Sequence, residues 1–172
     1  ELAIGLSVAG RRVRLNECHL RQKSNLVRLR GTITVPPTPS GWREVPFDYD
    51  LDAEVGNLRA LAALFGPPWN GLSGGLRAEG QGSGQAADGR GWLKVRGWDL
   101  SLRGLPPGSL QADLKLEGRD FKLTNLDVQS GSDFLRGGGH LTLDDSLSYQ
   151  GRLELRIREL ARYLGPLGRF AP

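Results

Sequence analysis

Aliphatic and polar residues alternate along much of the chain, and glycine-rich stretches separate the alternating segments. Residues 49–55, 110–117 and 149–157 show the alternation with almost no exceptions. A period of two residues places successive side chains on opposite faces of a β-strand. The sequence therefore predicts a sheet with one aliphatic face and one charged face.

About ten segments of this kind recur at intervals of roughly 8–12 residues, which is typical of all-β domains. Clusters of glycine and proline, such as 80–84 and 106–108, predict turns between them. The strands are expected near residues 2–8, 12–17, 26–35, 45–55, 72–79, 92–102, 109–117, 120–128, 134–143 and 148–157.

Apolar residues at helical spacing interrupt the strand pattern twice, and they predict one or two short helices. The first helix is expected near 57–65, where Asn57 is a suitable N-cap and a Gly-Pro-Pro sequence ends the segment. The second is expected near 158–164. The two lie about 100 residues apart and follow similar strands, so a unit of strands and a short helix repeats, most clearly over about 45–165.

The composition favours short strands and tight turns, and it disfavours binding to nucleic acid. The 25 glycines among 172 residues are about twice the usual share of ~7%. The net charge is only +4, with 23 lysines and arginines interspersed among 19 carboxylates, and 7% of the residues are aromatic. A nucleic-acid-binding protein more often concentrates positive charge on one face and adds stacking aromatics. We therefore expect no nucleic-acid partner.

Cys18 is the only cysteine, which excludes an intrachain disulfide and a cluster of thiolate metal ligands. No apolar run approaches the ~18 residues that a membrane-spanning helix needs. Strand alternation has already begun at residue 2, and the chain contains no methionine. We therefore expect the 172 residues to be a single β-rich fragment of a longer repeat protein.

An open twisted sheet of about ten strands must curl, split into two packed layers or close into a barrel. A closed β-sandwich, jelly roll or barrel would bury its aliphatic face, whereas a curved trough would leave that face available to an apolar ligand. Leucine and valine dominate the aliphatic positions and large aromatics are few, which leaves volume unfilled. We therefore expect an elongated, curved, mainly antiparallel sheet folded over an apolar trough, with a closed β-sandwich or jelly roll as the alternative.

Residues 51–66, followed by 72–80, resemble the repeat unit of the TamB/AsmA-like proteins, which are inner-membrane-anchored periplasmic proteins of diderm bacteria. The strands with glycine turns at 91–95, 100–102 and 134–143 continue the resemblance, which covers roughly 45–165. It implies a β-sheet folded over a hydrophobic interior, a form known as a β-taco.

The same resemblance implies a function and a location. The family is proposed to carry phospholipids across the periplasm, and TamB is proposed also to assist insertion of outer-membrane proteins with a partner of the Omp85 type, as a translocation and assembly module. The resemblance therefore implies a periplasmic segment whose parent chain is anchored in the inner membrane. The family has no catalytic residues to carry over to this sequence.

Two short motifs match enzyme signatures, but their surroundings do not fit. Residues 71–75 read G-x-S-x-G, yet a predicted helix precedes them and a strand follows, which reverses the order of a nucleophile elbow. Residues 82–87 read G-x-G-x-x-A without a following helix to bind phosphate. His19 and His140 have no neighbours at metal-ligand spacing. We expect no enzyme activity, no metal site and no cofactor.

We expect the functional site to be the aliphatic face itself, acting as a surface for phospholipid acyl chains. At ~0.8 kcal/mol per CH₂, a sixteen-carbon chain gains about 12 kcal/mol on leaving water. The residues expected to line the trough are Leu51, Val55, Leu93, Val95, Leu114, Leu116, Leu141, Leu143, Leu153 and Leu155. The residues considered for contact with anionic lipid headgroups are Arg12, Arg14, Arg28 and Arg30, whose default role is surface solubility.

The alternative function belongs to the closed architecture. A β-sandwich with a filled core would bind protein or carbohydrate through its loops, with one or more exposed tryptophans at the binding surface. The candidates are Trp42, Trp69, Trp92 and Trp98.

Overall fold

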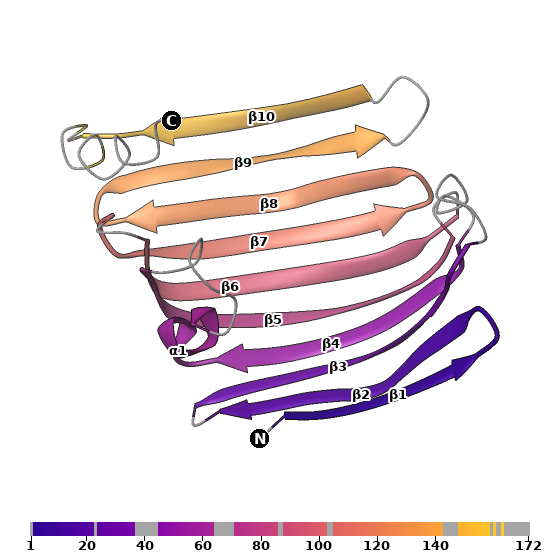
Figure 1. The fold of residues 1–172 in the computed structure, drawn as a ribbon. Helices are drawn as coiled ribbons and strands as arrows, with labels where there is room; N and C mark the ends of the chain where they lie inside the picture. The colour runs from indigo at the N-terminus through magenta and orange to yellow at the C-terminus, as the bar shows by residue number, and fades with distance from the viewer. Residues whose placement is uncertain are drawn as a thin grey trace, which may run out of the picture.

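The computed structural model describes residues 2–22, 24–36, 45–63, 71–85, 88–102, 105–142 and 148–158, together with 160 and 163. They form one antiparallel sheet of ten strands in which every strand pairs with its neighbours in sequence (Figure 1). The elements are β1 (Leu2–Ala9), β2 (Arg12–Gln22), β3 (Asn25–Thr34), β4 (Phe47–Val55), α1 (Leu58–Ala62), β5 (Leu72–Gly84), β6 (Arg90–Leu102), β7 (Gly108–Glu117), β8 (Asp120–Ser130), β9 (Asp133–Thr142) and β10 (Ser148–Arg156).

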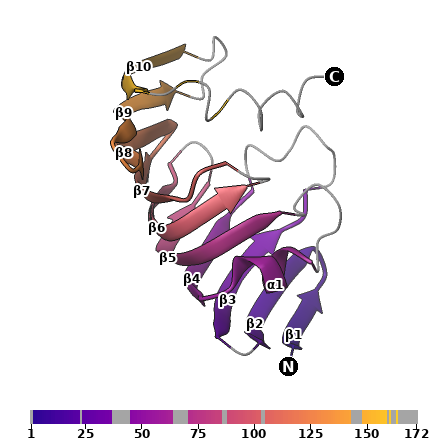
Figure 2. The ribbon, with the colours of Figure 1, turned by 90° about the vertical axis from the view of Figure 1, so that its left-hand side faces the viewer.

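The sheet does not close on itself, because β1 and β10 form its two edges. All strands in the described residues belong to this one sheet, so the closed β-sandwich or jelly roll is not the observed architecture. The prediction of an all-β fold with a curved, open sheet is confirmed. Figure 2 shows the curvature, with α1 on the concave side.

Bulges help to explain how a single sheet of this size becomes a trough. Shifts of register interrupt six of the nine strand pairings. A bulge adds an unpaired residue to one strand, bends that strand and increases the local twist. Spread over the sheet, these irregularities favour curling over a flat ribbon, and so give the sheet a concave and a convex face.

The ten predicted strands are all present, and two of them, β2 and β5, extend five residues further than expected. Strand β2 continues to Gln22, because a shift between Leu15 and Cys18 lets the alternation restart in the opposite phase. Strand β5 continues to Gly84, so the turn predicted at 80–84 is wrong. The glycines there lie within the sheet because larger side chains of neighbouring strands cover them. A Cβ atom on Gly80 would lie 3.1 Å from Leu93 Cδ1.

Helix α1 is attached to the sheet through an asparagine pair. The Asn57 side chain caps the helix by accepting a hydrogen bond from the Ala60 N–H at 3.1 Å. Asn25, at the start of β3, is buried and accepts from the Asn57 N–H at 2.8 Å. Its Nδ2 donates to the Asn57 carbonyl at 2.9 Å. These contacts fix the position at which the chain leaves β4 and enters α1, within the first of the two predicted helical segments.

The chain after β10 shows a similar arrangement at the start of β9. Asp133 is buried and accepts hydrogen bonds from the Arg158 N–H at 2.9 Å and from the Tyr163 hydroxyl at 2.7 Å. Thus Asn25, the first residue of β3, forms hydrogen bonds with the segment that follows β4. In the same way Asp133, the first residue of β9, forms hydrogen bonds with the segment that follows β10. Most of the second predicted helix, 158–164, lies outside the described residues.

An apolar face open to solvent

Cross-strand partners in an antiparallel sheet lie on the same face, so the pairing register defines rows of side chains that run across the strands. One row crosses the whole sheet without meeting a polar side chain, and we call it the Leu51 row. From β1 to β10 it contains Ile4, Cys18, Leu29, Leu51, Gly80, Leu93, Leu114, Leu123, Gly139 and Gly151.

Neighbouring rows on the same face are also apolar. The Ala53 row contains, from β2 to β10, Leu20, Val27, Ala53, Ala78, Val95, Ala112, Leu126, Gly137 and Leu153. The Val55 row contains, from β4 to β10, Val55, Leu76, Gly97, Leu110, Val128, Leu135 and Leu155. The Tyr49 row contains, from β1 to β10, Leu6, Leu15, Gly31, Tyr49, Gly82, Gly91, Leu116, Phe121, Leu141 and Tyr149.

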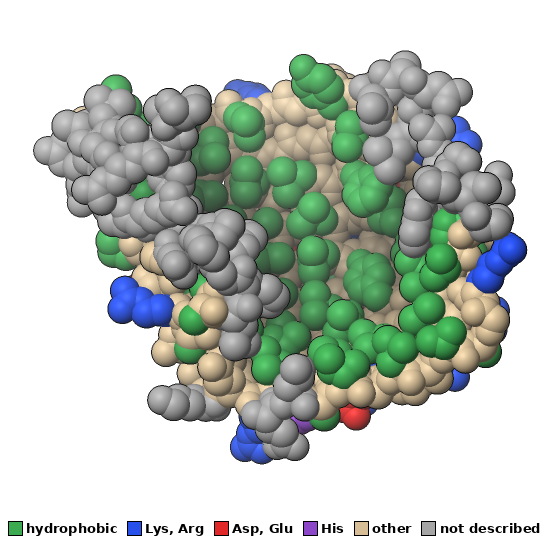
Figure 3. All heavy atoms as spheres, viewed as in Figure 1, with side chains coloured by type: hydrophobic (Ala, Val, Ile, Leu, Met, Phe, Trp, Pro, Cys, Tyr) green, Lys and Arg blue, Asp and Glu red, His purple; other side chains and the backbone are tan. Residues whose placement is uncertain are grey.

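Nine of the ten residues predicted to line a trough lie in these four rows, so the structure brings them onto one face; Leu143 is outside the described residues. Figure 3 looks onto the concave side of the sheet. Hydrophobic side chains gather in the hollow there, and the lysine and arginine side chains that are visible lie around its rim. The apolar face is therefore the concave one.

Cover over this face is uneven. Leu58 and Ala62 of α1 are buried, and α1 packs against β5. Close to the helix, Ala53 and Ala78 in the Ala53 row and Val55 in the Val55 row are buried as well. Away from the helix, the Tyr49 row is more open, and large side chains at its β8–β10 end are exposed, among them Phe121 and Leu141.

Two aromatic rings of β4 divide the open part of the face. Phe47 and Tyr49 are stacked, with ring centroids 6.4 Å apart and an interplanar angle of 20°. On one side is a hollow of about 350 Å³ with Leu93, Leu114, Leu116 and Phe121 in its wall. On the other is a hollow of about 270 Å³ with Val13, Leu15, Leu29 and Ile33 in its wall.

The Tyr49 ring lies along its row over glycines. A Cβ atom on Gly82 would be 2.6 Å from Tyr49 Cε1, and one on Gly91 would be 3.3 Å from the Tyr49 hydroxyl oxygen. Only glycine leaves room for the ring at Gly82. The hydroxyl donates a hydrogen bond to the Trp92 carbonyl at 3.2 Å, and burial raises the pKa of the phenol. The Tyr49 hydroxyl thus has a backbone hydrogen-bond partner, and the Tyr49 ring contributes apolar surface to the concave face.

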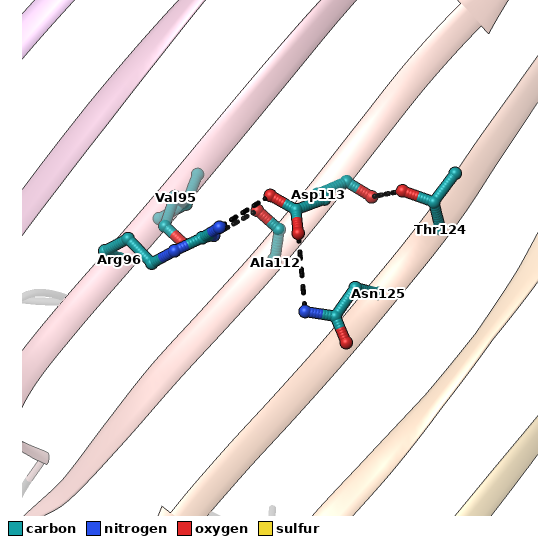
Figure 4. A network of polar contacts seen from close by, with 6 residues as sticks. All are labelled: Val95, Arg96, Ala112, Asp113, Thr124 and Asn125. Carbon is teal, nitrogen blue, oxygen red and sulfur yellow. Dashed lines mark hydrogen bonds and ion pairs between the residues drawn. The ribbon is translucent and has the colours of Figure 1, made fainter.

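The convex face carries the charges, which pair across strands. Figure 4 shows the network around Asp113, whose carboxylate lies 3.0 Å from Arg96 Nη2 and accepts from Asn125 Nδ2 at 3.3 Å. Arg96 also donates to the Val95 and Ala112 carbonyls, and the Thr124 hydroxyl donates to the Asp113 carbonyl at 3.1 Å. Partial burial acts to raise the pKa of Asp113, but the hydrogen bonds and the Arg96 charge outweigh it and lower the pKa below 3.8.

The four arginines considered for headgroup contact also lie on this convex face. Arg14, Arg28 and Arg30 each adjoin a residue of the four apolar rows, and Arg12 precedes Val13, which is in the wall of the concave hollow. Arg28 lies 3.8 Å from Asp52, and Arg30 lies 3.9 Å from Glu17. Arg12 and Arg14 have hydroxyl residues, Thr34 and Thr32, as their partners on β3.

The other candidate motifs lie in varied surroundings within the described part of the chain. Ser73 of the G-x-S-x-G match lies within β5 and pairs with Ser101, so it is not on a strand-to-helix turn. Within the described part of the chain, no three histidine, cysteine or acidic residues are grouped so as to hold a metal ion. Trp92 lies under the Lys94 ammonium at 5.2 Å and Trp98 is exposed, whereas Trp42 and Trp69 are outside the described residues.

No helix in the described residues is both long enough and apolar enough to cross a bilayer. Comparison of the chain with family models, with curated proteins and with solved structures gave no match. Membership of the TamB/AsmA-like family therefore stays a prediction, carried by the resemblance of the sequence.

Proposed function

We propose that this chain binds phospholipid acyl chains on its concave apolar face and shields them from water. We further propose that it does so as a periplasmic segment of a TamB/AsmA-like protein, in phospholipid transport and outer-membrane biogenesis, with an Omp85-type partner for the parent chain. The observation that carries the proposal is the set of apolar rows that cross the sheet and are only partly covered by α1.

The dimensions suit a lipid chain. Ten strands spaced by about 4.8 Å give an apolar face about 43 Å long across the strands. The hydrocarbon core of a bilayer is about 30 Å thick, so one leaflet, and hence one acyl chain, spans about 15 Å. An acyl chain can therefore lie along the rows within the length of the sheet, with room for more than one chain in line.

The chemistry of the face indicates what part of the lipid it would recognise. The hollow beside Tyr49 is almost purely apolar, and the Tyr49 hydroxyl already has a partner. The binding free energy of a ligand would come from the apolar area that it buries, at about 25 cal/mol per Å². No specific polar contact would be needed. Because the four candidate arginines lie on the convex face, we assign them no headgroup and leave the headgroup at the rim in water.

Mass spectrometry under native conditions, together with lipid extraction, tests the proposal directly. We expect phospholipid to co-purify with the chain from bacteria and to be lost on Leu116→Arg. Leu116 lies in the wall of the larger hollow, where an arginine can still reach solvent through the open face. The matched control is Lys115→Gln, the preceding residue on the convex side of the same strand, which should retain the lipid.

Cys18 offers a second readout, because it is the only cysteine and belongs to the Leu51 row. A fluorophore that senses polarity, attached to this thiol, should shift its emission to shorter wavelength when phospholipid is added. The deacylated headgroup should produce no shift. A folded, lipid-free protein whose label ignores intact phospholipid, or a Leu116→Arg variant that retains its lipid, would overturn the proposal.

A further inference from the structure

Strand β6, in the middle of the sheet, carries two tryptophans on the convex face. Trp92 and Trp98 are six residues apart, and the pairing of β6 with β5 runs without a shift from one to the other. An even spacing in an unbroken strand places both side chains on one face, opposite to that of Leu93 in the Leu51 row. At about 3.3 Å per residue, the two tryptophans lie about 20 Å apart along the strand.

The Trp98 ring rests on a glycine of the neighbouring strand. A Cβ atom on Gly75 of β5 would overlap the indole at Cε2, Cζ2 and Nε1, so the ring lies directly against the backbone there. The side chain is nevertheless 40% exposed. Gly75 therefore gives the indole a seat on the sheet from which its exposed surface faces solvent.

Trp92 borders a hollow of about 740 Å³, which is larger than either hollow of the apolar face. In register beside Trp92 are Gln81 on β5 and Lys115 on β7, with Asp50 on β4 beyond Gln81. The Lys94 ammonium lies over the Trp92 ring, 5.2 Å from its centroid. A cation–π contact at an exposed site is weak, so the ring of a ligand can take the place of the ammonium.

Charged groups of both signs line this hollow in equal number. They are the carboxylates of Asp50, Asp113 and Glu117 and the cations of Arg90, Lys94 and Lys115. In the part of the chain that the structure describes, the side chains of Asp50, Gln81 and Arg90 make no hydrogen bond or ion pair. The hollow therefore offers free donors and free acceptors without an excess of either charge.

These features fit an uncharged oligosaccharide better than another polymer. A pyranose ring stacks its C–H face on an indole, and each hydroxyl on its rim can both donate and accept a hydrogen bond. Single-stranded nucleic acid also stacks on aromatic rings, but its phosphates require a positively charged groove and would meet the carboxylates here. The core of a protein interface is depleted of charged residues, whereas charged side chains directly adjoin Trp92.

We propose that the convex side of β6 binds an uncharged oligosaccharide, with one sugar ring stacked on Trp92 and a later one on Trp98. Asp50, Gln81 and Arg90 form hydrogen bonds with the hydroxyls of the sugar at Trp92. The intervening sugars pass over Lys94 and Arg96, which share this face of the strand. The inference does not depend on the proposed function, because the site lies on the opposite face of the sheet from the apolar trough.

Calorimetric titration with three uncharged hexasaccharides tests the class of ligand. The probes are cellohexaose, maltohexaose and chitohexaose, and an oligothymidylate represents single-stranded nucleic acid. We expect at least one of the hexasaccharides to bind and the oligothymidylate to give no signal. If none of the three binds, or if only the oligothymidylate binds, the inference is overturned.

Variants of the two tryptophans test the placement of the ligand. Trp92→Ala should weaken binding of the hexasaccharide and of the corresponding disaccharide by about ten-fold or more, whereas Trp92→Tyr, which keeps an aromatic ring, should retain most of the affinity. Trp98→Ala should weaken binding of the hexasaccharide alone, since a disaccharide at Trp92 is too short to reach Trp98. Circular dichroism checks that each variant is folded.

The matched control is Phe121→Ala, because Phe121 is 39% exposed, almost as much as Trp98, but lies on the concave face. It should leave saccharide binding unchanged. Equal losses in Phe121→Ala and Trp98→Ala, or unaltered affinity in folded Trp92→Ala, would also overturn the inference. Phospholipid is measured separately on Trp98→Ala, which should retain it, so failure of the saccharide site and failure of lipid binding can be told apart.

Discussion

The Ala53 row passes through two environments, one beside α1 on an inner strand and one on the edge strand β10. At β4 it is under the α1 end of the molecule, and Ala53 is 6% exposed. At β10 the same row ends in Leu153, which is 66% exposed. Side-chain size differs between the two places. The row has Ala53 and Ala78 close to the helix, and Leu153 on β10, where no described residue packs over it.

That difference separates two uses of one apolar face. Beneath α1, small residues let the helix approach the strands, and the contact forms the core of the molecule. Away from α1, large apolar residues are exposed on the sheet, which is the arrangement expected of a surface that binds an apolar ligand. The comparison predicts that identical substitutions will have opposite outcomes in the two regions.

The largest contrast is expected between Val55→Asp and Leu155→Asp, which change the two ends of the Val55 row. Val55 is 1% exposed, so its replacement buries a carboxylate without a partner and should cost at least about 3 kcal/mol of unfolding free energy. Leu155 is 64% exposed, and its replacement should cost less than about 0.5 kcal/mol. Urea denaturation followed by circular dichroism measures both.

Equal losses of stability in these two variants would contradict the distinction between covered and open regions. Such a result would indicate that the face around Leu155 is packed as a core, as in the closed architecture. The result can be checked without denaturant, because Leu155→Asp should also leave the far-ultraviolet spectrum unchanged, whereas Val55→Asp should not.

A smaller effect is expected from Asn25→Ala, which removes the attachment of α1 while leaving the helix sequence intact. Two hydrogen bonds to Asn57 are lost and its backbone N–H and C=O are left without these partners, at a cost of about 2–3 kcal/mol. The helix should detach from Ala53 and Ala78 more readily, so the open part of the face grows. Binding of a dye that senses apolar surfaces should rise.

The control for this variant is Asn25→Asp, which retains the acceptor oxygen for the Asn57 N–H and loses the donor to its carbonyl. It should fall between the parent protein and Asn25→Ala in both stability and dye binding. If Asn25→Ala lowers stability with no change in dye binding, then α1 does not act as the cover over this end of the trough.

A more local effect is expected where glycines lie under larger side chains. Gly82→Ala forces the Tyr49 ring away from β5 and weakens its hydrogen bond to the Trp92 carbonyl, for an expected loss of about 1–2 kcal/mol. Gly151→Ala, on the bare edge strand, meets no atom closer than 3.1 Å and should cost less than about 0.5 kcal/mol. Thermal unfolding of the two variants compares a covered glycine with an open one.

The alternation of residues was sufficient to predict the number of strands and which side chains share a face. It could not place the glycines correctly, since Gly80 and Gly82 look like a turn in the sequence and lie within β5 in the structure. What keeps them in the strand is Leu93 and Tyr49, which belong to other strands. Contacts between a glycine and a side chain of an adjacent strand cannot be recognised from the order of residues in the sequence.

The sequence did not indicate how the charges are arranged, and its alternation alone did not decide whether the sheet closes; the composition, rich in leucine and valine and poor in aromatics, was what favoured the open trough. Arg96 and Asp113 are far apart along the chain, and only the register of β6 against β7 brings them together. Closure depends on twist and bulges, so the alternating pattern left a trough and a sandwich both open. The role of Asn25 was missed completely, and its one signal was a polar residue at the first position of an otherwise apolar strand face.

The smallest effect concerns the convex face behind the covered region, where Asp113 directly follows the buried Ala112. The pKa of Asp113 is lower in the folded chain than its ordinary value of 3.8, so its contribution to stability is complete above that value and is lost as the pH falls through the folded pKa. The ion pair is partly exposed, which limits the contribution to at most about 1 kcal/mol. Asp113→Asn should therefore lower stability slightly near neutral pH, and the difference between the two proteins should shrink as the pH falls through the lowered pKa of Asp113. Urea titrations of the two proteins over a series of acid and neutral pH values measure the convergence. A difference that stays constant from neutral to acid conditions would show that Asp113 acts through packing and its other hydrogen bonds, with no contribution from its charge.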